Sequence, residues 1–360
     1  MIGFSVFLND DWSKEKENYI HQMADSGFEG VFTSLHIPED DPSKYSDRLK
    51  NLLKLIKTRN LKLMIDISND ALKNIGLSLS NPKAIFESGI TGLRMDDGID
   101  LEVIANLSHW ITVGLNASTL TEEDYEKLVE YNADFSNMEA WHNYYPRPNT
   151  GLDEKWFYEK NVWLKSKHFK LSAFAPGDDR LRFPLYETLP TLEIHRYQNP
   201  FYASLSLLRD FMIDDVYIGD PGLLNATRYQ FKGYFHGRTI LFHAITIDHK
   251  WDSYVYKDHR NRLDVSKDVI RSEQSRMLHK NDDITSENTV RRKRGSITID
   301  NNLYKRYKGE IQIVKRELSP DAKVNVIGQI LDYDLPLLDF VKDGTKFKLA
   351  DIREVQDGLG

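Results

Sequence analysis

Asp66, Asp96 and Glu139 are the residues of this chain whose type and placement most directly suggest chemistry. Each stands within or at the end of a short apolar run of the length that β-strands usually have. A carboxyl group can donate or accept a proton in a reaction when its surroundings adjust its pKa. Acids that converge on one site also repel one another, so a substrate or a counter-charge must compensate them. We therefore predict that these three acids are catalytic, against the alternative that a single acid of this kind caps a helix.

The segment after Glu139 reads AWHNYYPRPNTG and combines aromatic, basic and amide side chains. Trp141, Tyr144 and Tyr145 offer flat faces on which a sugar ring can stack, and their neighbours offer directional hydrogen bonds. Two prolines fix backbone φ angles and so reduce the entropy lost on binding. The alternative is a packed loop whose aromatic residues are buried. The predicted substrate ligands in this loop are His142, Asn143, Tyr145 and Arg147.

Two further segments supply candidate substrate ligands. Residues 175–200 form a long stretch without regular periodicity, and long ordered loops of this kind are usually functional. Residues 257–276 place arginines beside serines, which suits a phosphate or a carboxylate, although a charged run is also typical of a solvated surface. Together with Asn116, the predicted ligands are Glu193, His195 and Arg196 in the first segment and Arg271, Ser272 and Arg276 in the second.

A metal site is the alternative use of these residues. Acids together with His36, His142 and His195 could ligate a divalent ion. The sequence has no HxH or HExxH spacing, however, and each of these histidines stands alone in its segment. Glycine-rich nucleotide motifs after the strand-like runs are also missing from the sequence. We therefore predict neither a metal nor a cofactor.

The first two-thirds of the chain alternates strand-like runs with amphipathic helical segments, a pattern typical of a parallel α/β sheet. Eight such units fit a (β/α)8 barrel better than an open, doubly wound sheet. This predicts a barrel domain over residues 1–238. The expected strands are residues 2–8, 30–35, 61–68, 92–97, 111–118, 133–139, 170–176 and 215–220.

Alternation along these strands indicates which side chains face the inside of the barrel. Residues 61–68 place Leu and Ile at the odd positions and Lys, Met, Asp and Ser at the even ones. The two faces of a strand are independent, so the aliphatic face suits the helices and the polar face suits the lumen. Because such barrels form their sites at the carboxyl ends of the strands, we place Asn9, Asp66, Asp96, Asn116 and Glu139 there, although the parity of 133–139 is ambiguous.

From about residue 239 the pattern changes to short runs of period two separated by polar turns. Helical periodicity is scarce in this part, which favours a small, mostly antiparallel β-domain or β-barrel over residues 239–360.

Composition restricts the function classes. The 360 residues carry a net charge of −7 and include no cysteine, which excludes disulfides and thiol chemistry and argues against nucleic-acid binding. Without a long apolar run or a basic leader, the chain predicts neither a membrane span nor a signal peptide. We expect a cytoplasmic protein.

Several segments along essentially the whole chain resemble one bacterial family. They are MIGFSVFL (1–8), TSLHIPE (33–39), RMDDG (94–98), TLEIHR (191–196), DVIRSEQSR (268–276) and, most specifically, NYYPRPNTGL (143–152) and RGSITIDN (294–301). The resemblance is to the 6-phospho-N-acetylmuramidases, which are cytoplasmic glycoside hydrolases. It implies a TIM barrel followed by a cyclophilin-like β-domain. It also implies cleavage of the β-1,4 bond of 6-phospho-N-acetylmuramyl-N-acetylglucosamine, to N-acetylmuramic acid 6-phosphate and N-acetylglucosamine, during peptidoglycan recycling.

A substrate of this kind would use the candidate residues well, because it carries two sugar rings, a carboxylate and a phosphate. Glycoside hydrolysis typically uses one protonated and one ionised carboxyl. We expect Glu139 as the general acid, since apolar surroundings raise a carboxyl pKa, and Asp96 or Asp66 as nucleophile, base or stabiliser. Substrate assistance by the 2-acetamido group, a lyase or isomerase reaction on a sugar phosphate, and a non-enzymatic binding role stay open. The stereochemical outcome and the oligomeric state also stay open.

Overall fold

The structure is a computed structural model and describes residues 1–9, 11–35, 45–68, 71–95 and 98–353. The chain divides into two compact units, Met1–Leu223 and Leu224–Gly360. The sequence placed the boundary after residue 238, whereas helix α8 (Asn225–Gly237) is grouped here with the second unit. Gln230 of α8 donates to the Leu241 carbonyl (3.1 Å) and to the Asp334 carboxylate (2.9 Å), and both partners belong to that unit.

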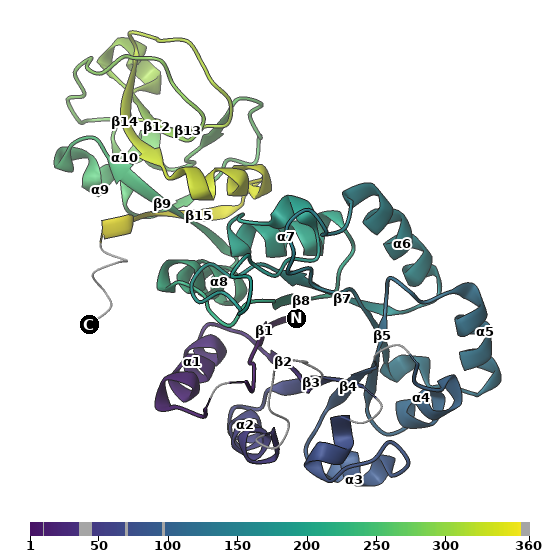
Figure 1. The fold of residues 1–360 in the computed structure, drawn as a ribbon. Coiled ribbons are helices and arrows are strands. Elements are labelled where there is room, and N and C mark those ends of the chain that lie inside the picture. Colours follow the sequence, from purple (N-terminus) through teal and green to yellow (C-terminus); the bar gives the residue numbers. More distant parts are fainter. Residues whose placement is uncertain (10, 36–44, 69–70, 96–97, 354–360) are drawn as a thin grey trace. The chain divides into compact units, whose positions relative to one another are not determined.

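The first unit is a closed barrel of eight parallel strands, as predicted. In Figure 1 the strands form the centre and the helices lie around them. The register is continuous around the barrel, because Gly3 pairs with Gly30 on one side and with Tyr217 on the other. The strands are β1 (Ile2–Ser5), β2 (Gly30–Ser34), β3 (Lys62–Ile67), β4 (Gly92–Met95), β5 (Thr112–Asn116), β6 (Met138–Trp141), β7 (Lys170–Ala175) and β8 (Asp215–Ile218).

Side-chain caps begin most of the helices that connect these strands. Ser13, Asp100, Thr121 and Asp153 each accept a hydrogen bond from a backbone N–H of the first helical turn, which satisfies a donor that the helix leaves unpaired. The helices are α1 (Lys14–Asp25), α2 (Tyr45–Arg59), α3 (Pro82–Glu87), α4 (Leu101–Ser108), α5 (Glu122–Glu130), α6 (Glu154–Ser166) and α7 (Pro200–Asp210), with short 3₁₀ helices η2 (Ala71–Ile75), η3 (Phe135–Asn137) and η4 (Glu193–His195).

Strand β6 begins later than the sequence predicted. Residues 133–139 were expected to be the strand, but Phe135–Asn137 form a 3₁₀ turn that Asp134 caps through the Ser136 N–H at 3.0 Å. Phe135 packs against the rings of Tyr125 and Phe169, so its apolar character serves a helix–loop contact. The strand itself starts at Met138, which makes Glu139 its second residue.

Large side chains and glycines together fill the lumen. Phe32, Met64, Trp141, Phe174 and Tyr217 form one buried cluster, as expected when inward residues of alternate strands interdigitate. Small residues make room for it: a Cβ at Gly3 would lie 2.2 Å from the Tyr217 ring, and one at Gly114 would lie 2.8 Å from Trp141. The strand alternation predicted for residues 61–68 therefore holds, with Met64 in the lumen.

The second unit is a seven-stranded, nearly closed sheet with the order β10-β15-β9-β14-β12-β13-β11. An isolated bridge between Asn261 and Ser272 links its two edge strands. The pairing is antiparallel, as predicted, except that β15 runs parallel to β9. The strands are β9 (Thr239–Thr246), β10 (Asp258–Arg260), β11 (Val269–Arg271), β12 (Ser296–Asp300), β13 (Ile311–Val314), β14 (Val324–Ile330) and β15 (Lys346–Asp351), and the helices are α9 (Asp252–Val255), α10 (Ser275–Leu278), η5 (His249–Trp251), η6 (Asn302–Tyr307) and η7 (Asp332–Phe340).

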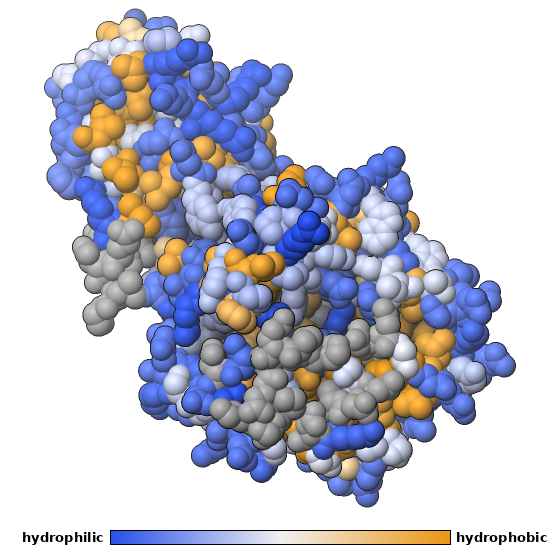
Figure 2. Space-filling model, viewed as in Figure 1, coloured by the Kyte–Doolittle hydropathy of each residue, from blue (hydrophilic) through white to orange (hydrophobic). Residues whose placement is uncertain are grey.

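The visible surface is predominantly hydrophilic, with apolar side chains in small groups (Figure 2). Within the described residues, every helix is too short or too polar to cross a membrane.

Candidate active site

Asp66 is the centre of a polar group at the carboxyl end of the barrel. Its carboxylate accepts hydrogen bonds from the Ser34 hydroxyl at 3.0 Å and from Nη1 of Arg94 at 2.6 Å. The other terminal nitrogen of Arg94 donates to the side-chain oxygen of Asn143. Ser34 ends β2 and Asn143 follows β6, so the group joins four strands at the end where barrel enzymes form their sites.

Arg94 holds this group together through its hydrogen bonds to Asp66 and Asn143. Its side chain is also almost completely buried, with 8% exposed, and that of Asp66 is 14% exposed. A buried ion pair of this kind orients Asp66, and removing either charge would leave the other unpaired. The carboxylate of Asp66 is fixed in place at the carboxyl end of the barrel.

Tyr144 and Arg182 lie beside the same end of the lumen. Arg182 donates to the Tyr144 hydroxyl at 2.6 Å, and its guanidinium lies over the rings of Phe7 (4.5 Å) and Tyr144 (5.5 Å). Tyr144 also meets the edge of Phe174, and burial raises the pKa of its phenol. Among the described residues, Arg182 has no carboxylate at ion-pair distance, so its charge stays available to an anionic ligand.

Glu139 lies at the opposite end of the lumen, and its predicted place at the carboxyl end of β6 is wrong. It pairs in register with Lys170, the first residue of β7. Lys170 contacts both Glu139 (3.1 Å) and Asp215, the first residue of β8. The indole N–H of Trp141 donates to Glu139 at 2.8 Å. Trp141 and the buried aromatic cluster thus lie between Glu139 and the Asp66 group.

Glu193 and Arg196 join two loops of the barrel. Their side chains pair at 2.7 Å, and Arg196 also donates to the carbonyls of Thr188 and Tyr145. Glu193 accepts the backbone N–H groups of Asn149 and Gly151. The hydrogen bond from Arg196, with these amides, lowers the pKa of Glu193 to about 2. The predicted role of both residues as substrate ligands is not supported, because their donors and acceptors hold the β6 and β7 loops.

His142 and His195 are buried away from the Asp66 group. His142 bonds Asn161 of α6 at 2.7 Å and packs on Phe157 of the same helix, so it faces the helices and not the lumen. Burial lowers the pKa of His142 to about 3 and that of His195 to about 4, which keeps both rings neutral. Sequence parity could not place His142, because the start of β6 was misjudged.

The remaining predicted ligands are dispersed. Asn116, the last residue of β5, lies at the carboxyl end and accepts the Ser118 N–H at 3.1 Å. Tyr145 is half-buried, with its backbone N–H on the Pro190 carbonyl, and Arg147 is exposed. Arg271, Ser272 and Arg276 belong to the second unit. There Arg271 is paired with Glu310 at 2.7 Å, and Ser272 bonds His259 at 2.9 Å.

Some predicted residues cannot be placed, and one lies elsewhere. Asp96 and His36 lie outside the described residues. Asn9, predicted to face the lumen, is exposed. Within the described part of the chain, acids and histidines do not form a group of three that could hold a metal ion.

Sequence reasoning missed Ser34, Arg94 and Arg182 as members of the site, and it named Tyr144 only as a face for sugar stacking. Alternation could have found Arg94, because it occupies an inward position of β4 two residues before Asp96. Arg182 carries no such signal, since a loop of this length has no periodicity from which to infer direction.

The site defines a class before any comparison. A (β/α)8 barrel with an ion-paired carboxylate, amides and an arginine at its carboxyl end has the arrangement typical of a barrel enzyme. Comparison with family models then makes the assignment specific. Residues 2–232 match the N-terminal model and residues 242–350 the C-terminal model of 6-phospho-N-acetylmuramidase. The chain belongs to this family, and it is a glycoside hydrolase.

Two solved structures are similar to the whole chain. A conserved protein of unknown function from Enterococcus faecalis shares 43% identity, with a TM-score of 0.91, over 99% of this chain and 98% of its own. An uncharacterized B. cereus protein shares 24% identity, with a TM-score of 0.74, over 97% and 99%, and this likeness shows the fold alone. A search of curated proteins found no match.

Proposed function

We propose that this enzyme hydrolyses the β-1,4 bond of 6-phospho-N-acetylmuramyl-N-acetylglucosamine, releasing N-acetylmuramic acid 6-phosphate and N-acetylglucosamine for peptidoglycan recycling. The family match supports the substrate class. The observation that carries the proposal is the Asp66 carboxylate, held by Ser34 and Arg94 at the carboxyl end of the barrel. A cytoplasmic location is part of the proposal and agrees with the lack of cysteine.

Asp66 takes the role of the ionised carboxylate. Glycoside hydrolysis develops positive charge at the anomeric carbon, and a fixed anion beside that carbon stabilises the transition state without having to reorganise. Asp66 can do this as a nucleophile, as a base for water, or by orienting a 2-acetamido group that attacks in its place. Its ion pair with Arg94 favours these roles over proton donation.

The proton donor must be a second carboxyl, and we propose Asp96. It follows Arg94 by two positions in the sequence and lies outside the described residues. Glu139 is no longer proposed as the donor, because the aromatic cluster separates it from the Asp66 group. In its place in the lumen, Glu139 compensates the charge of Lys170.

Arg182 is proposed as the ligand of an anionic substituent of the substrate. Its guanidinium is oriented by Tyr144 and Phe7 and lacks a carboxylate partner among the described residues. An arginine fork suits phosphate and carboxylate alike. Asn143 and Asn116 at the same end supply amides for sugar hydroxyls.

Incubation of the enzyme with phosphorylated and unphosphorylated N-acetylmuramyl-N-acetylglucosamine tests the proposal directly. We expect mass spectrometry to detect N-acetylglucosamine from the phosphorylated disaccharide only. Release from neither compound would remove the proposal, and equal release from both would remove the role of the phosphate. NMR of the first-formed anomer then separates retention from inversion.

A further inference from the structure

A second hollow of chemical interest lies within the β-rich unit. Its volume is about 420 Å³, within the range of roughly 300–1,000 Å³ typical of small-molecule sites. Strands β10 and β15 and helix α10 contribute to its wall. The lining residues that matter here are Lys257, His259, Arg260, Ser272, Lys346 and Phe347.

His259 and Ser272 give one wall a fixed polarity. His259 Nε2 lies 3.1 Å from the Val255 carbonyl, which can only accept, so Nε2 carries the proton. Nδ1 is then the acceptor for the Ser272 hydroxyl at 2.9 Å. The imidazole stacks on Phe347 with centroids 5.0 Å apart, and burial lowers its pKa to about 4. Because the proton of Ser272 is committed to His259, its oxygen offers a lone pair to a ligand hydroxyl.

Lys257 brings an incompletely compensated charge to the same hollow. Its ammonium lies 3.3 Å from Nε2 of His279, whose Nδ1 bonds Asp282 at 2.9 Å. Among the described residues, Lys257 has no carboxylate at ion-pair distance, although it is half-buried. Burial lowers the pKa of this amine, and a charge in this position is costly until an anion accompanies it.

Arg260 and Lys346 add two cations at the exposed margin of the hollow, since they alternate with the buried residues His259 and Phe347. They are directly opposite in the register of β10 and β15, an arrangement that like charges destabilise. Asp258, which also lines the hollow, is opposite Lys348 in the same register, so a cation already faces it. The wall is thus positive in a chain whose net charge is −7.

We propose that this hollow binds a small hydroxylated oxyanion, such as a sugar phosphate or a hydroxy acid. Its phosphate or carboxylate lies against Lys257, and a ligand hydroxyl donates to Ser272. The proposal does not depend on the proposed hydrolysis, because it concerns binding alone.

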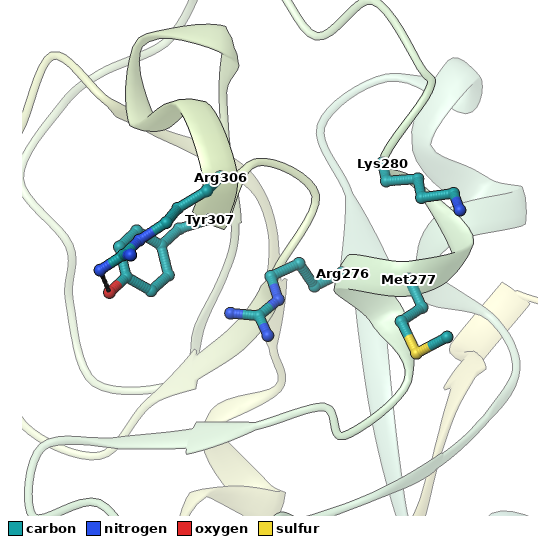
Figure 3. Close-up of a pocket in the computed structure, with 5 residues that line it drawn as sticks. All are labelled: Arg276, Met277, Lys280, Arg306 and Tyr307. Carbon is teal, nitrogen blue, oxygen red and sulfur yellow. Dashed lines mark hydrogen bonds between the residues drawn. The ribbon is translucent and has the colours of Figure 1, made fainter.

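A neighbouring hollow offers a worse fit for the same ligand. It is lined by Arg276, Met277, Lys280, Arg306 and Tyr307. Figure 3 shows that Arg276 points toward Tyr307, whereas Lys280 points away from it. The ring of Tyr307 already faces the guanidinium groups of Arg276 (5.7 Å) and Arg306 (4.9 Å). These cations do not converge on one point, so Lys280 serves as a matched control for Lys257.

Isothermal titration calorimetry of the full chain tests the proposal, with glucose 6-phosphate and lactate as the two oxyanion probes and glucose as the uncharged control. We expect at least one oxyanion to bind and glucose not to bind. Lys257→Met should weaken binding by roughly tenfold or more, the loss expected for a charge-assisted hydrogen bond, and Lys280→Met should leave it unchanged. The probe that binds decides between phosphate and carboxylate.

A second measurement locates the bound probe without a variant. Lysine acetylation followed by mass spectrometry should show that the binding probe protects Lys257 and not Lys280. Binding that survives Lys257→Met, protection of Lys280 alone, or no binding of either oxyanion would overturn the proposal. Binding that persists in Arg182→Met, a change in the barrel, would support it, and loss of binding in that variant would place the ligand elsewhere.

Discussion

The two ends of the barrel lumen hold similar groups in different surroundings. At the carboxyl end, Asp66 pairs with Arg94 at 2.6 Å. At the amino end, Lys170 lies between Glu139 and Asp215, and the Met1 ammonium pairs with Asp215 at 3.0 Å. The side chains of Asp66 and Glu139 are 14% and 13% exposed. Burial therefore does not distinguish the two acids.

The two ends differ in whether polar groups beside the acid remain able to bind a ligand. At the amino end, two acids meet two cations and an indole N–H, so the charges compensate one another. At the carboxyl end, Asn143 bonds Arg94, the partner of Asp66. The amide of Asn116 and the guanidinium of Arg182 lie at the same end of the barrel. The end of the strand, and not the residue type, therefore separates the acid that we propose as catalytic from the acid that compensates Lys170.

Replacement of Asp66, the acid at the carboxyl end of the barrel, should have the largest effect on turnover. Asp66→Asn keeps the hydrogen bond from Ser34 but removes the negative charge, so we expect turnover of the phosphorylated disaccharide to fall by roughly 10²–10⁴-fold. Release of N-acetylglucosamine measures it, and circular dichroism checks that the barrel is intact. Turnover close to that of the unaltered enzyme would show that Asp66 is not catalytic.

Loss of the Arg94 cation at the carboxyl end should lower both stability and activity. Arg94→Met leaves Asp66 buried without its partner, so we expect a loss of about 3 kcal/mol in the free energy of unfolding, together with reduced turnover. Urea unfolding measures the first quantity. Arg59→Met is the matched control, because Arg59 pairs with the exposed Asp25 and should change stability by less than about 1 kcal/mol. Equal effects of the two changes would contradict the assigned role of Arg94.

The acid at the amino end should behave in the opposite way to Asp66. Glu139→Gln retains the shape but weakens the contact with Lys170, so we expect a loss of about 1–2 kcal/mol of stability and unchanged turnover by the folded fraction. Parallel assays with Asp66→Asn make the contrast. If Glu139→Gln abolished turnover while remaining folded, the aromatic cluster would not separate the two ends as we describe.

The stability that the buried His142 contributes should depend on pH. Burial holds its pKa at about 3, below the value of about 6.5 in an unfolded chain. Its contribution to stability is therefore complete above pH 6.5 and is lost as the pH falls toward 3. Between pH 6.5 and 5.5 the stability advantage over His142→Gln should shrink by about 1 kcal/mol.

Urea unfolding at the two pH values provides this measurement. His195 and His259 have lowered pKa values as well, but they are present in both proteins and cancel in the difference. A constant difference across this range would mean that the His142 ring is not buried as a neutral group.

Much of the barrel could be predicted because each strand carries its own signal. Alternation in residues 61–68 placed Met64 and Asp66 in the lumen, and the structure has them there. The same reasoning failed at residues 133–139, where Phe135 is apolar because it packs on Tyr125 and Phe169. The short run contained no cue to separate a 3₁₀ turn from a strand. That single error moved Glu139 from the amino end to the carboxyl end.

Contacts between distant segments were beyond sequence reasoning. Glu193 and Arg196 have the residue types of a binding site, yet their hydrogen bonds join the β6 and β7 loops. Arg271 has the character of a phosphate ligand but faces Glu310. Residue type states what a side chain can bind, and only its neighbours in space decide whether it is already bound.

The sequence by itself determined the fold class, the family and the position of Asp66 at the carboxyl end of the barrel. Periodicity and local motifs are properties of contiguous residues, so they can be recognised without the fold. The tertiary structure decided which acid adjoins groups that can bind a ligand, which arginine lacks a carboxylate partner among the described residues, and which histidines are buried. Those outcomes depend on pairs such as Arg94–Asp66 and Lys170–Glu139, separated by 28 and 31 positions. Electrostatic compensation acts through space, so it becomes visible only when the eight strands close around one lumen.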